Sequence, residues 1–185
     1  MARILEATVE VLAGDPEASM AAIARHAGVV RATIYVHFAN RESLIAAVTD
    51  RAIAEVTQAI EDAEPGRDHP VEALARVVAA TWQSLGRFHA LIAINTQLPH
   101  VELHHPGHAT LAKLHPLIKR GQRDGSFRDD VPATWHLAML RALVHAASAE
   151  FRAGRLSEAQ IEAALVTTVL GALAAPPTNS DSADA

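Results

Sequence analysis

The stretch "HAGVVRATIYVHFAN", residues 26–40, decides the fold of this chain. Gly28 lies four residues after Ala24, Val29 follows it directly, and Ile34 comes five positions later. A small residue lets two helices cross closely, a glycine turns the chain, and apolar residues seat the second helix. This spacing predicts a helix-turn-helix, whose second helix enters the major groove of DNA.

The expected second helix, residues 31–37, has two different faces. At about 100° per residue, Ile34 and Phe38 fall together and should face the core, while Ala32 and Val36 lie opposite them. Hydrogen-bonding side chains border that opposite face on both sides, which suits a groove with base edges on its floor and phosphates along its rims. The alternative is a short helix whose polar side is only solvated, but the turn and the preceding capped helix favour DNA. We expect base contacts from Arg31, Ala32 and Val36 and phosphate contacts from Thr33, Tyr35 and His37.

Helical periodicity continues along the whole chain, with Gly and Pro between the helical stretches. Ser19, Asn40 and Ser157 are expected N-caps, and the glycines at 28 and 154 are expected helix ends. We predict an all-α protein with a helix-turn-helix domain over residues 1–50, a helical domain over 51–175 and a disordered tail over 176–185. The expected helices span 2–13, 20–26, 31–37, 41–63, 71–88, 89–97, 107–122, 132–153 and 158–174.

Residues 2–51 closely resemble the N-terminal DNA-binding domain of the TetR family of bacterial transcriptional regulators. The resemblance rests on "ILEATVEVLA" and on "MAAIARHAGVVRATIYVHFANRESLIAAV". It implies that Thr33, Tyr35 and His37 contact phosphates, and that Arg41 at the start of the next helix does the same. Ser19 completes our set of DNA-binding candidates. The positions that match the family pattern are Thr33, Ile34, Tyr35, His37, Phe38, Arg41 and Leu44.

The sequence departs from the family pattern at Val30, where a capping Ser or Thr often begins the recognition helix. A cap contributes about 1 kcal/mol, so we expect this helix to be less stable when it is free of DNA. The first 50 residues carry four Arg against six acidic residues, and the whole chain has a formal net charge of −5. This balance argues against non-specific coating of nucleic acid and favours modest, salt-dependent binding.

The last two expected helices are apolar on more than one side, which is typical of helices packed on a partner. The TetR resemblance implies the same arrangement, a symmetric homodimer that presents two recognition helices to a palindromic site. A thick core within one chain is the alternative interpretation. Our candidates for the dimer interface are Leu140, Val144, Phe151, Ile161, Leu165 and Val169.

The resemblance also implies a ligand pocket in the C-terminal domain, between the fifth and eighth helices. The candidate side chains are of mixed size and have few polar partners, which suggests a small apolar effector that releases a repressor from its operator. Each of these residues could equally be ordinary core. They are Trp82, Leu85, Phe88, Leu91, Ile92, Leu111, Leu114, Ile118 and Trp135.

Histidine is the remaining compositional signal: eight of the 11 fall between residues 89 and 145. His100, His104, His105 and His108 cluster in one Pro-containing stretch, so a metal-responsive regulator is an alternative. A metal-dependent helical enzyme is less favoured, since the chain has no nucleophile motif and no phosphate loop. No cofactor is expected. Without cysteine, a signal peptide or an apolar run that could span a bilayer, the chain is expected to be cytoplasmic.

Overall fold

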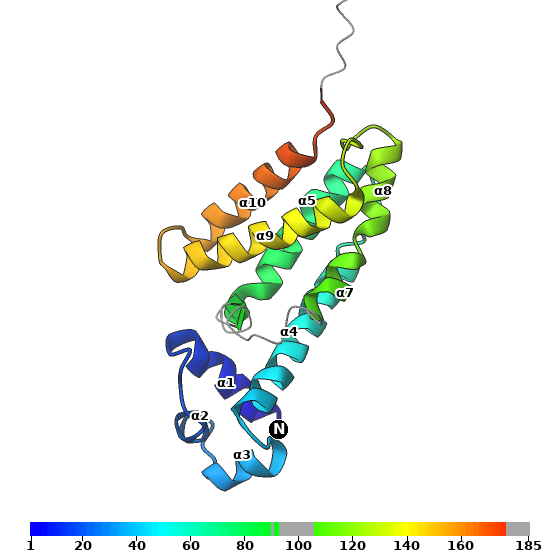
Figure 1. Ribbon diagram of the computed structural model, residues 1–185. Helices are drawn as coiled ribbons and strands as arrows, with labels where there is room; N and C mark the ends of the chain where they lie inside the picture. Colours follow the sequence, from blue (N-terminus) through cyan, green and yellow to red (C-terminus); the bar gives the residue numbers. More distant parts are fainter. Residues whose placement is uncertain (90, 93–105, 177–185) are drawn as a thin grey trace, which may run out of the picture.

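The computed structural model describes residues 1–89, 91–92 and 106–176. Its regular elements in these residues are helices, apart from an isolated bridge between Phe127 and Ala174, so the expected all-α class is confirmed (Figure 1). The N-terminal helices are α1 (Ala2–Gly14), α2 (Met20–His26), α3 (Arg31–His37) and α4 (Arg41–Asp62). They are followed by α5 (Pro70–Leu85), the 3-10 turn η1 (Gly86–Phe88), α7 (Pro106–Ala112), α8 (His115–Arg123), α9 (Ala133–Arg152) and α10 (Glu158–Leu173).

Helix α4 contributes to two separate hydrophobic cores. Its N-terminal part packs with α1, α2 and α3, and Ala52 is its last residue in that core. Val56 is its first residue in the C-terminal core, which also holds Leu74, Ile118 and Leu173. The cores therefore divide within α4, about one turn after the domain boundary that we propose at residue 50.

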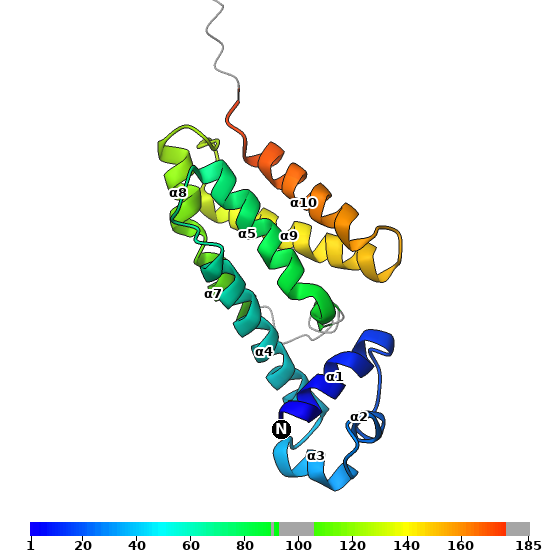
Figure 2. The ribbon, with the colours of Figure 1, turned by 180° about the vertical axis from the view of Figure 1, so that it is seen from behind.

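The C-terminal helices are arranged around α5. Seen from behind, α5 runs between α4 and α10 and packs against both (Figure 2). Helices α9 and α10 form an antiparallel hairpin along one side of the domain, while α8 packs against α5 and α9 (Figure 1). The DNA-binding candidates on α3 lie at the opposite end of the molecule from α8.

The expected caps are in place. The Ser19 side chain accepts a hydrogen bond from the backbone of Ala22, and capping boxes begin α4 at Asn40 and α10 at Ser157. Gly28 follows α2 with a φ of +64°, a left-handed conformation that costs glycine little. The boundaries of α2, α4 and α10 accordingly lie within one residue of the expected ones.

The helix expected over residues 107–122 is wrong as a single element, because it is divided into α7 and α8. Pro116 lies in the first turn of α8 and has no N–H to donate to the carbonyl of Ala112. The chain tightens there instead: the amide of Lys113 donates to Thr110 at 3.2 Å and that of Leu114 to Leu111 at 2.9 Å.

The helix expected over 71–88 is wrong at its C-terminal end: it ends at Leu85, where Gly86 takes a φ of 14° and a ψ of −102° and η1 begins. Two other expectations extend to parts of the chain outside the described residues. Of the helix expected over 89–97, residue 90 and residues 93–97 lie outside the described part. The same holds for most of the disordered tail expected over 176–185.

Candidate functional site

The turn between α2 and α3 is held by an arginine from α1. Arg3 donates from Nη2 to the carbonyl of Ala27 at 2.6 Å and to that of Gly28 at 3.3 Å. A Cβ on Gly28 would lie 3.1 Å from Arg3 Nη2, so the glycine also allows this close approach. Sequence patterns did not identify Arg3, because the contact joins residues 24 or more positions apart. The recognition helix is thus fixed in direction by α1 as well as by its own turn.

Helix α3 has the two faces that its periodicity predicts. Ile34 is fully buried in the N-terminal core and Phe38 is buried beside it. Val36, on the opposite face, is 79 % exposed, and Arg31, Ala32 and His37 are exposed with it, while Thr33 is half-buried. The exposed face of α3 is therefore a small apolar strip bordered by hydrogen-bonding side chains. That this face contacts DNA stays a prediction.

Arg31 and Tyr35 are already associated with each other on this surface. Arg31 Nη2 donates to the Tyr35 hydroxyl at 3.0 Å, and the guanidinium carbon lies 5.2 Å from the centre of the Tyr35 ring. The hydroxyl accepts this bond and keeps its own O–H, which can donate to a phosphate oxygen. The two side chains are consequently ordered together, one turn apart on α3.

Val30 directly precedes α3, and Arg41 is the first residue of α4. Arg41, expected to contact phosphate, donates through Nη2 to the carbonyl of Pro16 and through Nε to that of Ala18 at 3.4 Å. It therefore fixes the loop between α1 and α2, and only its remaining N–H groups are open to a phosphate. Val30 precedes α3 without any side-chain cap, as the sequence predicts, and it is 70 % exposed.

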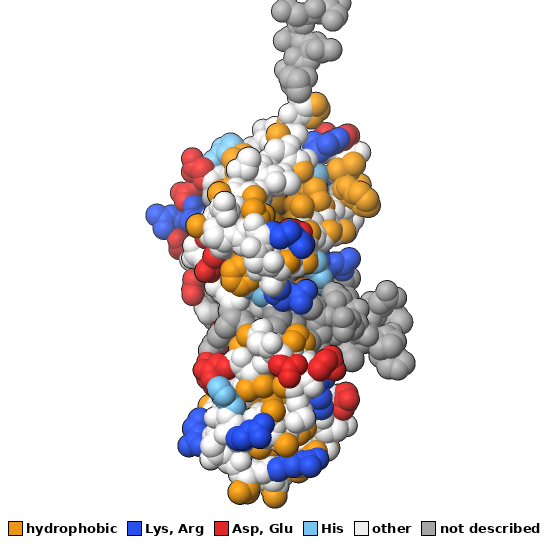
Figure 3. Space-filling model, turned by 90° about the vertical axis from the view of Figure 1, so that its left-hand side faces the viewer, with side chains coloured by type: hydrophobic (Ala, Val, Ile, Leu, Met, Phe, Trp, Pro, Cys, Tyr) orange, Lys and Arg blue, Asp and Glu red, His pale blue; other side chains and the backbone are white. Residues whose placement is uncertain are grey.

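The acidic residues of α1 are paired with basic side chains. His26 Nε2 lies 2.7 Å from Glu10 Oε2, and Arg51 Nη1 lies 3.1 Å from Glu6 Oε2. In the space-filling view, basic side chains gather over the end of the molecule formed by the N-terminal helices, with acidic side chains nearer the middle (Figure 3). The charge distribution is therefore favourable to a polyanion at that end despite the net negative charge.

The ligand-binding candidates do not all lie together. Phe88 and Leu91 are buried in the N-terminal core, against α1, and Trp135 is 62 % exposed on α9, so these three do not line the interior of the C-terminal domain. The apolar character of Phe88 and Leu91 did not indicate whether they belong to the N-terminal or the C-terminal core. The candidates that belong to or pack on the C-terminal core are Trp82, Leu85, Ile92, Leu111, Leu114 and Ile118.

A histidine that sequence analysis did not select lies beside Trp82. The rings of Trp82 and His89 are 4.3 Å apart between centroids, and the Phe151 ring lies 4.9 Å from that of His89. His89 is 3 % exposed, and burial, reinforced by the positive charge of Arg152, lowers its pKa from 6.5 to about 4. Helical spacing does not signal this contact, because α5 ends at Leu85 and Gly86 turns the chain before His89.

The expected dimer interface is wrong for four of its six residues. Leu140, Ile161, Leu165 and Val169 are each at most 5 % exposed and belong to the core of their own chain. Val144 and Phe151 are half-buried and pack against the same core. Hydrophobicity alone favoured the interface, but the thick core that was the alternative interpretation accounts for these residues. The outward side of α10 instead carries small uncharged residues: Ala163, Ala164, Thr167, Thr168 and Gly171.

The histidine cluster falls largely outside the described residues: His100, His104 and His105 do so entirely, and His108 lies in α7. Within the described part of the chain, no group of three or more His, Cys, Asp or Glu side chains is arranged to hold a metal ion. The same part contains no helix long and apolar enough to cross a membrane.

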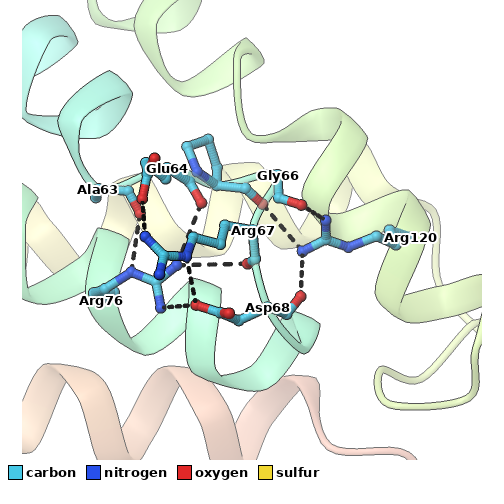
Figure 4. Close-up of polar contacts among 8 residues, drawn as sticks. Ala63, Glu64, Gly66, Arg67, Asp68, Arg76 and Arg120 are labelled. Carbon is cyan, nitrogen blue, oxygen red and sulfur yellow. Dashed lines mark hydrogen bonds and ion pairs between the residues drawn. The ribbon is translucent and has the colours of Figure 1, made fainter.

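Two arginines hold the loop between α4 and α5 (Figure 4). Arg76 of α5 donates to the carbonyl of Ala63 at 3.0 Å and to Asp68 Oδ2 at 3.1 Å. Arg120 of α8 donates to the carbonyls of Pro65 at 3.1 Å and Asp68 at 3.2 Å, and also to that of Gly66. The C-terminal end of α4 is thereby tied to α8.

The fold and the exposed recognition helix define a helix-turn-helix DNA-binding protein. Residues 4–48 match the model of a family described as bacterial regulatory proteins, tetR family. A curated relative, the fatty acid metabolism regulator protein of Bacillus subtilis (strain 168), is 32 % identical over 98 residues. That match covers 52 % of this chain, and it spans half the length of the relative.

Solved structures share the fold over nearly the whole chain. The fatty acid degradation regulator FadR from Bacillus halodurans has a TM-score of 0.74 at 20 % identity, covering 92 % of this chain and 98 % of its own. LfrR from Mycobacterium smegmatis, in complex with proflavine, has a TM-score of 0.73 at 23 % identity, covering 94 % and 96 %. FadR from Bacillus subtilis, in complex with stearoyl-CoA, has a TM-score of 0.74 at 18 % identity, covering 92 % and 98 %.

Proposed function

We propose that the protein is a cytoplasmic, non-enzymatic, homodimeric repressor that binds a palindromic operator and is released from it by a small apolar ligand. The DNA-binding part of this proposal rests on the exposed face of α3, which follows a turn held by Gly28 and Arg3. A rigid scaffold that presents exposed hydrogen-bonding side chains on a short helix suits insertion into a major groove.

The site residues divide by the contact that each would make. Arg31 and Val36 would read base edges, while Thr33 and Tyr35 would bind phosphates on the two rims of the groove. Ser19 and Arg41, at the starts of α2 and α4, would add phosphate contacts outside α3. A protein with this arrangement needs two copies of α3 for a palindromic site.

The surface that suits a second copy of this chain is the outward side of α9 and α10. Its residues on α10 are small and uncharged, which permits close helix packing and avoids burying charge. The hairpin of α9 and α10 also lies along one side of the domain (Figure 1), so two copies could form a four-helix interface around a two-fold axis. We infer an isologous dimer through this surface.

The ligand is expected to be apolar and to enter the C-terminal domain near Trp82. This inference draws support from two similar proteins, one named as a fatty acid metabolism regulator and one solved with stearoyl-CoA. A ligand that binds better to one spacing of the two recognition helices shifts the dimer towards that spacing.

The DNA half is tested by mobility shifts with DNA flanking the coding region of the protein. Arg31→Ala and Tyr35→Ala should each weaken binding about tenfold or more. Arg123→Ala, on α8 at the far end, removes the same charge as Arg31→Ala and should leave binding unchanged. Equal effects of Arg31→Ala and Arg123→Ala would contradict the proposed surface.

The dimer is tested by light scattering. Thr167→Arg places a long cation on the outward side of α10 and should convert the dimer to a monomer, whereas Ala13→Arg, on an exposed position of α1, should not. A native protein that is monomeric at micromolar concentration, or a Thr167→Arg protein that remains dimeric, would contradict this part of the proposal.

A further inference from the structure

Two polar atoms in the aromatic cluster of the C-terminal domain are buried without a hydrogen-bond partner among the described residues. They are Nε1 of Trp82 and Nε2 of His89. The Trp82 side chain is fully buried and His89 is 3 % exposed, so neither atom is satisfied by bulk water. Most buried polar groups in folded proteins are paired, so two unpaired groups on rings 4.3 Å apart require an explanation.

The hydrogen bonds around His89 favour a proton on its Nδ1 atom. His89 Nδ1 lies 3.2 Å from the hydroxyl oxygen of Ser148, and that hydroxyl donates its single proton to the carbonyl of Val144 at 2.9 Å. With that proton donated to Val144, the Ser148 oxygen accepts from His89, which places the histidine proton on Nδ1. Nε2 is then a bare acceptor, while the neighbouring Trp82 Nε1 is a donor only.

We propose that Trp82 and His89 bind the hydroxyl or carboxyl group of the effector. An O–H group accepts a hydrogen bond from Trp82 Nε1 and donates its own proton to His89 Nε2, which satisfies both atoms at once. A carboxylic acid does the same in its protonated form, whereas an ester or an ether can only accept. This inference rests on the proposed ligand-responsive function and specifies which chemical group the ligand carries.

The neutral state of His89 supports this assignment. Burial and Arg152 hold its pKa at about 4, so at neutral pH Nε2 keeps its lone pair for the ligand. The Phe151 ring lies 6.1 Å from Trp82 and 4.9 Å from His89 between centroids, and it supplies an apolar surface for the rest of the molecule. An apolar body with one O–H group therefore matches the cluster.

The position of the cluster connects it to the DNA-binding domain. His89 directly follows Phe88, which is 1 % exposed in the N-terminal core, and Leu91 is buried in the same core. A ligand that pairs with His89 acts on a segment whose neighbouring side chains pack against α1. Occupation of the site is consequently coupled to the helices that hold α3.

The test uses three probes with the same alkyl chain: dodecanoic acid, dodecanol and methyl dodecanoate. The chain has two tryptophans, so a Trp135→Phe background leaves Trp82 as the only fluorophore of this type. At about pH 5, part of the acid keeps its O–H group while His89 stays neutral. Under these conditions the acid and the alcohol should change the Trp82 emission saturably and bind about tenfold or more tightly than the ester, because the ester leaves His89 Nε2 unpaired. An ester that binds as tightly as the acid and the alcohol, or the absence of binding by any probe, would overturn the proposal.

Two variants separate recognition from packing. His89→Phe keeps an aromatic ring without the acceptor and should remove the preference for O–H probes. Ser148→Ala removes the acceptor for Nδ1, which frees the proton to move to Nε2, and the ester should then bind at least as well as the alcohol. Phe151→Leu is the control, since it alters the apolar wall and should keep the preference. A preference that persists in both His89→Phe and Ser148→Ala contradicts the assignment.

Release of bound DNA distinguishes this inference from the function on which it rests. If the acid and the alcohol release the DNA and the ester does so only at about tenfold higher concentration, the proposed repressor function and the Trp82–His89 assignment are both supported. If all three probes release it equally, the ligand-responsive repressor stands and the Trp82–His89 assignment fails. If the protein does not bind DNA at all, the proposed function fails, whatever the fluorescence titration shows.

Discussion

Phe88 and His89 are adjacent in the chain, yet their side chains are buried in two different parts of the molecule. Phe88 belongs to the N-terminal core around α1, whereas His89 stacks on Trp82 of α5 in the C-terminal domain. The peptide bond between them is therefore a direct connection between the DNA-binding helices and the region expected to bind the effector. A second connection runs through α4, which contributes to both cores.

Phe88→Ala should loosen the first of these connections. Removing a fully buried phenylalanine side chain costs about 3–5 kcal/mol of unfolding free energy. We expect a large fall in stability by denaturant titration and faster amide hydrogen exchange in α1. Leu156→Ala, at a 37 % exposed position between α9 and α10, serves as the control and should have a small effect. Unchanged exchange in α1 would show that Phe88 does not support that helix.

Gly28→Ala should weaken both folding and DNA binding. The φ of +64° costs a residue with a Cβ about 1–2 kcal/mol, and the new atom would also press on Arg3 Nη2. Gly154→Ala is a matched control, since Gly154 has a φ of +65° but open space within 4 Å of the point where its Cβ would lie. Both variants should lose stability, and Gly28→Ala alone should lose affinity in a mobility shift. Equal affinities of the two variants would argue against a role for the Arg3 contact.

Val30→Ser should stabilise the protein by about 1 kcal/mol, because it supplies the missing N-cap of α3. Thermal unfolding would register this as a rise of a few degrees in Tm. Val36→Ser makes the same chemical change at an exposed position inside α3, where no cap is formed, and should not raise Tm. A similar shift in both variants would point to the loss of exposed apolar surface instead.

Stability should fall as the pH decreases from about 6.5 towards 4. In the folded protein the pKa of His89 is about 4, whereas the unfolded chain has a histidine pKa near 6.5, so between these values the unfolded state binds more protons. The stabilisation is complete above about pH 6.5 and amounts to at most about 3 kcal/mol, which is lost as the pH reaches 4. Denaturant titrations at several pH values would measure it.

His89→Phe is the control for this pH dependence, because phenylalanine does not titrate. Carboxyl groups also contribute in the same direction: hydrogen bonds from Arg155 and Arg128 lower the pKa of Glu150 and Asp130. The difference between native protein and variant removes these shared contributions. Identical slopes for the two proteins between pH 4 and 6.5 would contradict a buried, neutral His89.

Local signals in the sequence predicted the helix-turn-helix in detail. Periodicity placed Ile34 in the core and Val36 outside, and capping residues placed the starts of α2, α4 and α10. These features depend on residues three or four positions apart, which a single helix brings together. The DNA contacts themselves stay a prediction.

Contacts between distant segments could not be predicted in the same way. Hydrophobicity shows that Ile161, Leu165 and Val169 avoid water but not whether they meet their own chain or a second copy. The role of Arg3 depends on carbonyls 24 residues away, and the pairing of His89 with Ser148 spans 59 residues. A single sequence contains no record of such distances.

The hydrogen bonds of Arg76 and Arg120 to the loop between α4 and α5 affect how α4 can move. They fix one end of α4 to α5 and α8, while the other end of this helix carries α3. At about 1.5 Å per residue, a helix of 22 residues is a rod about 33 Å long. A tilt of only about 5° at the end of α4 near this loop moves the end near α3 by about 3 Å. A small rearrangement around α8 would therefore be amplified into a displacement comparable to the spacing between base pairs.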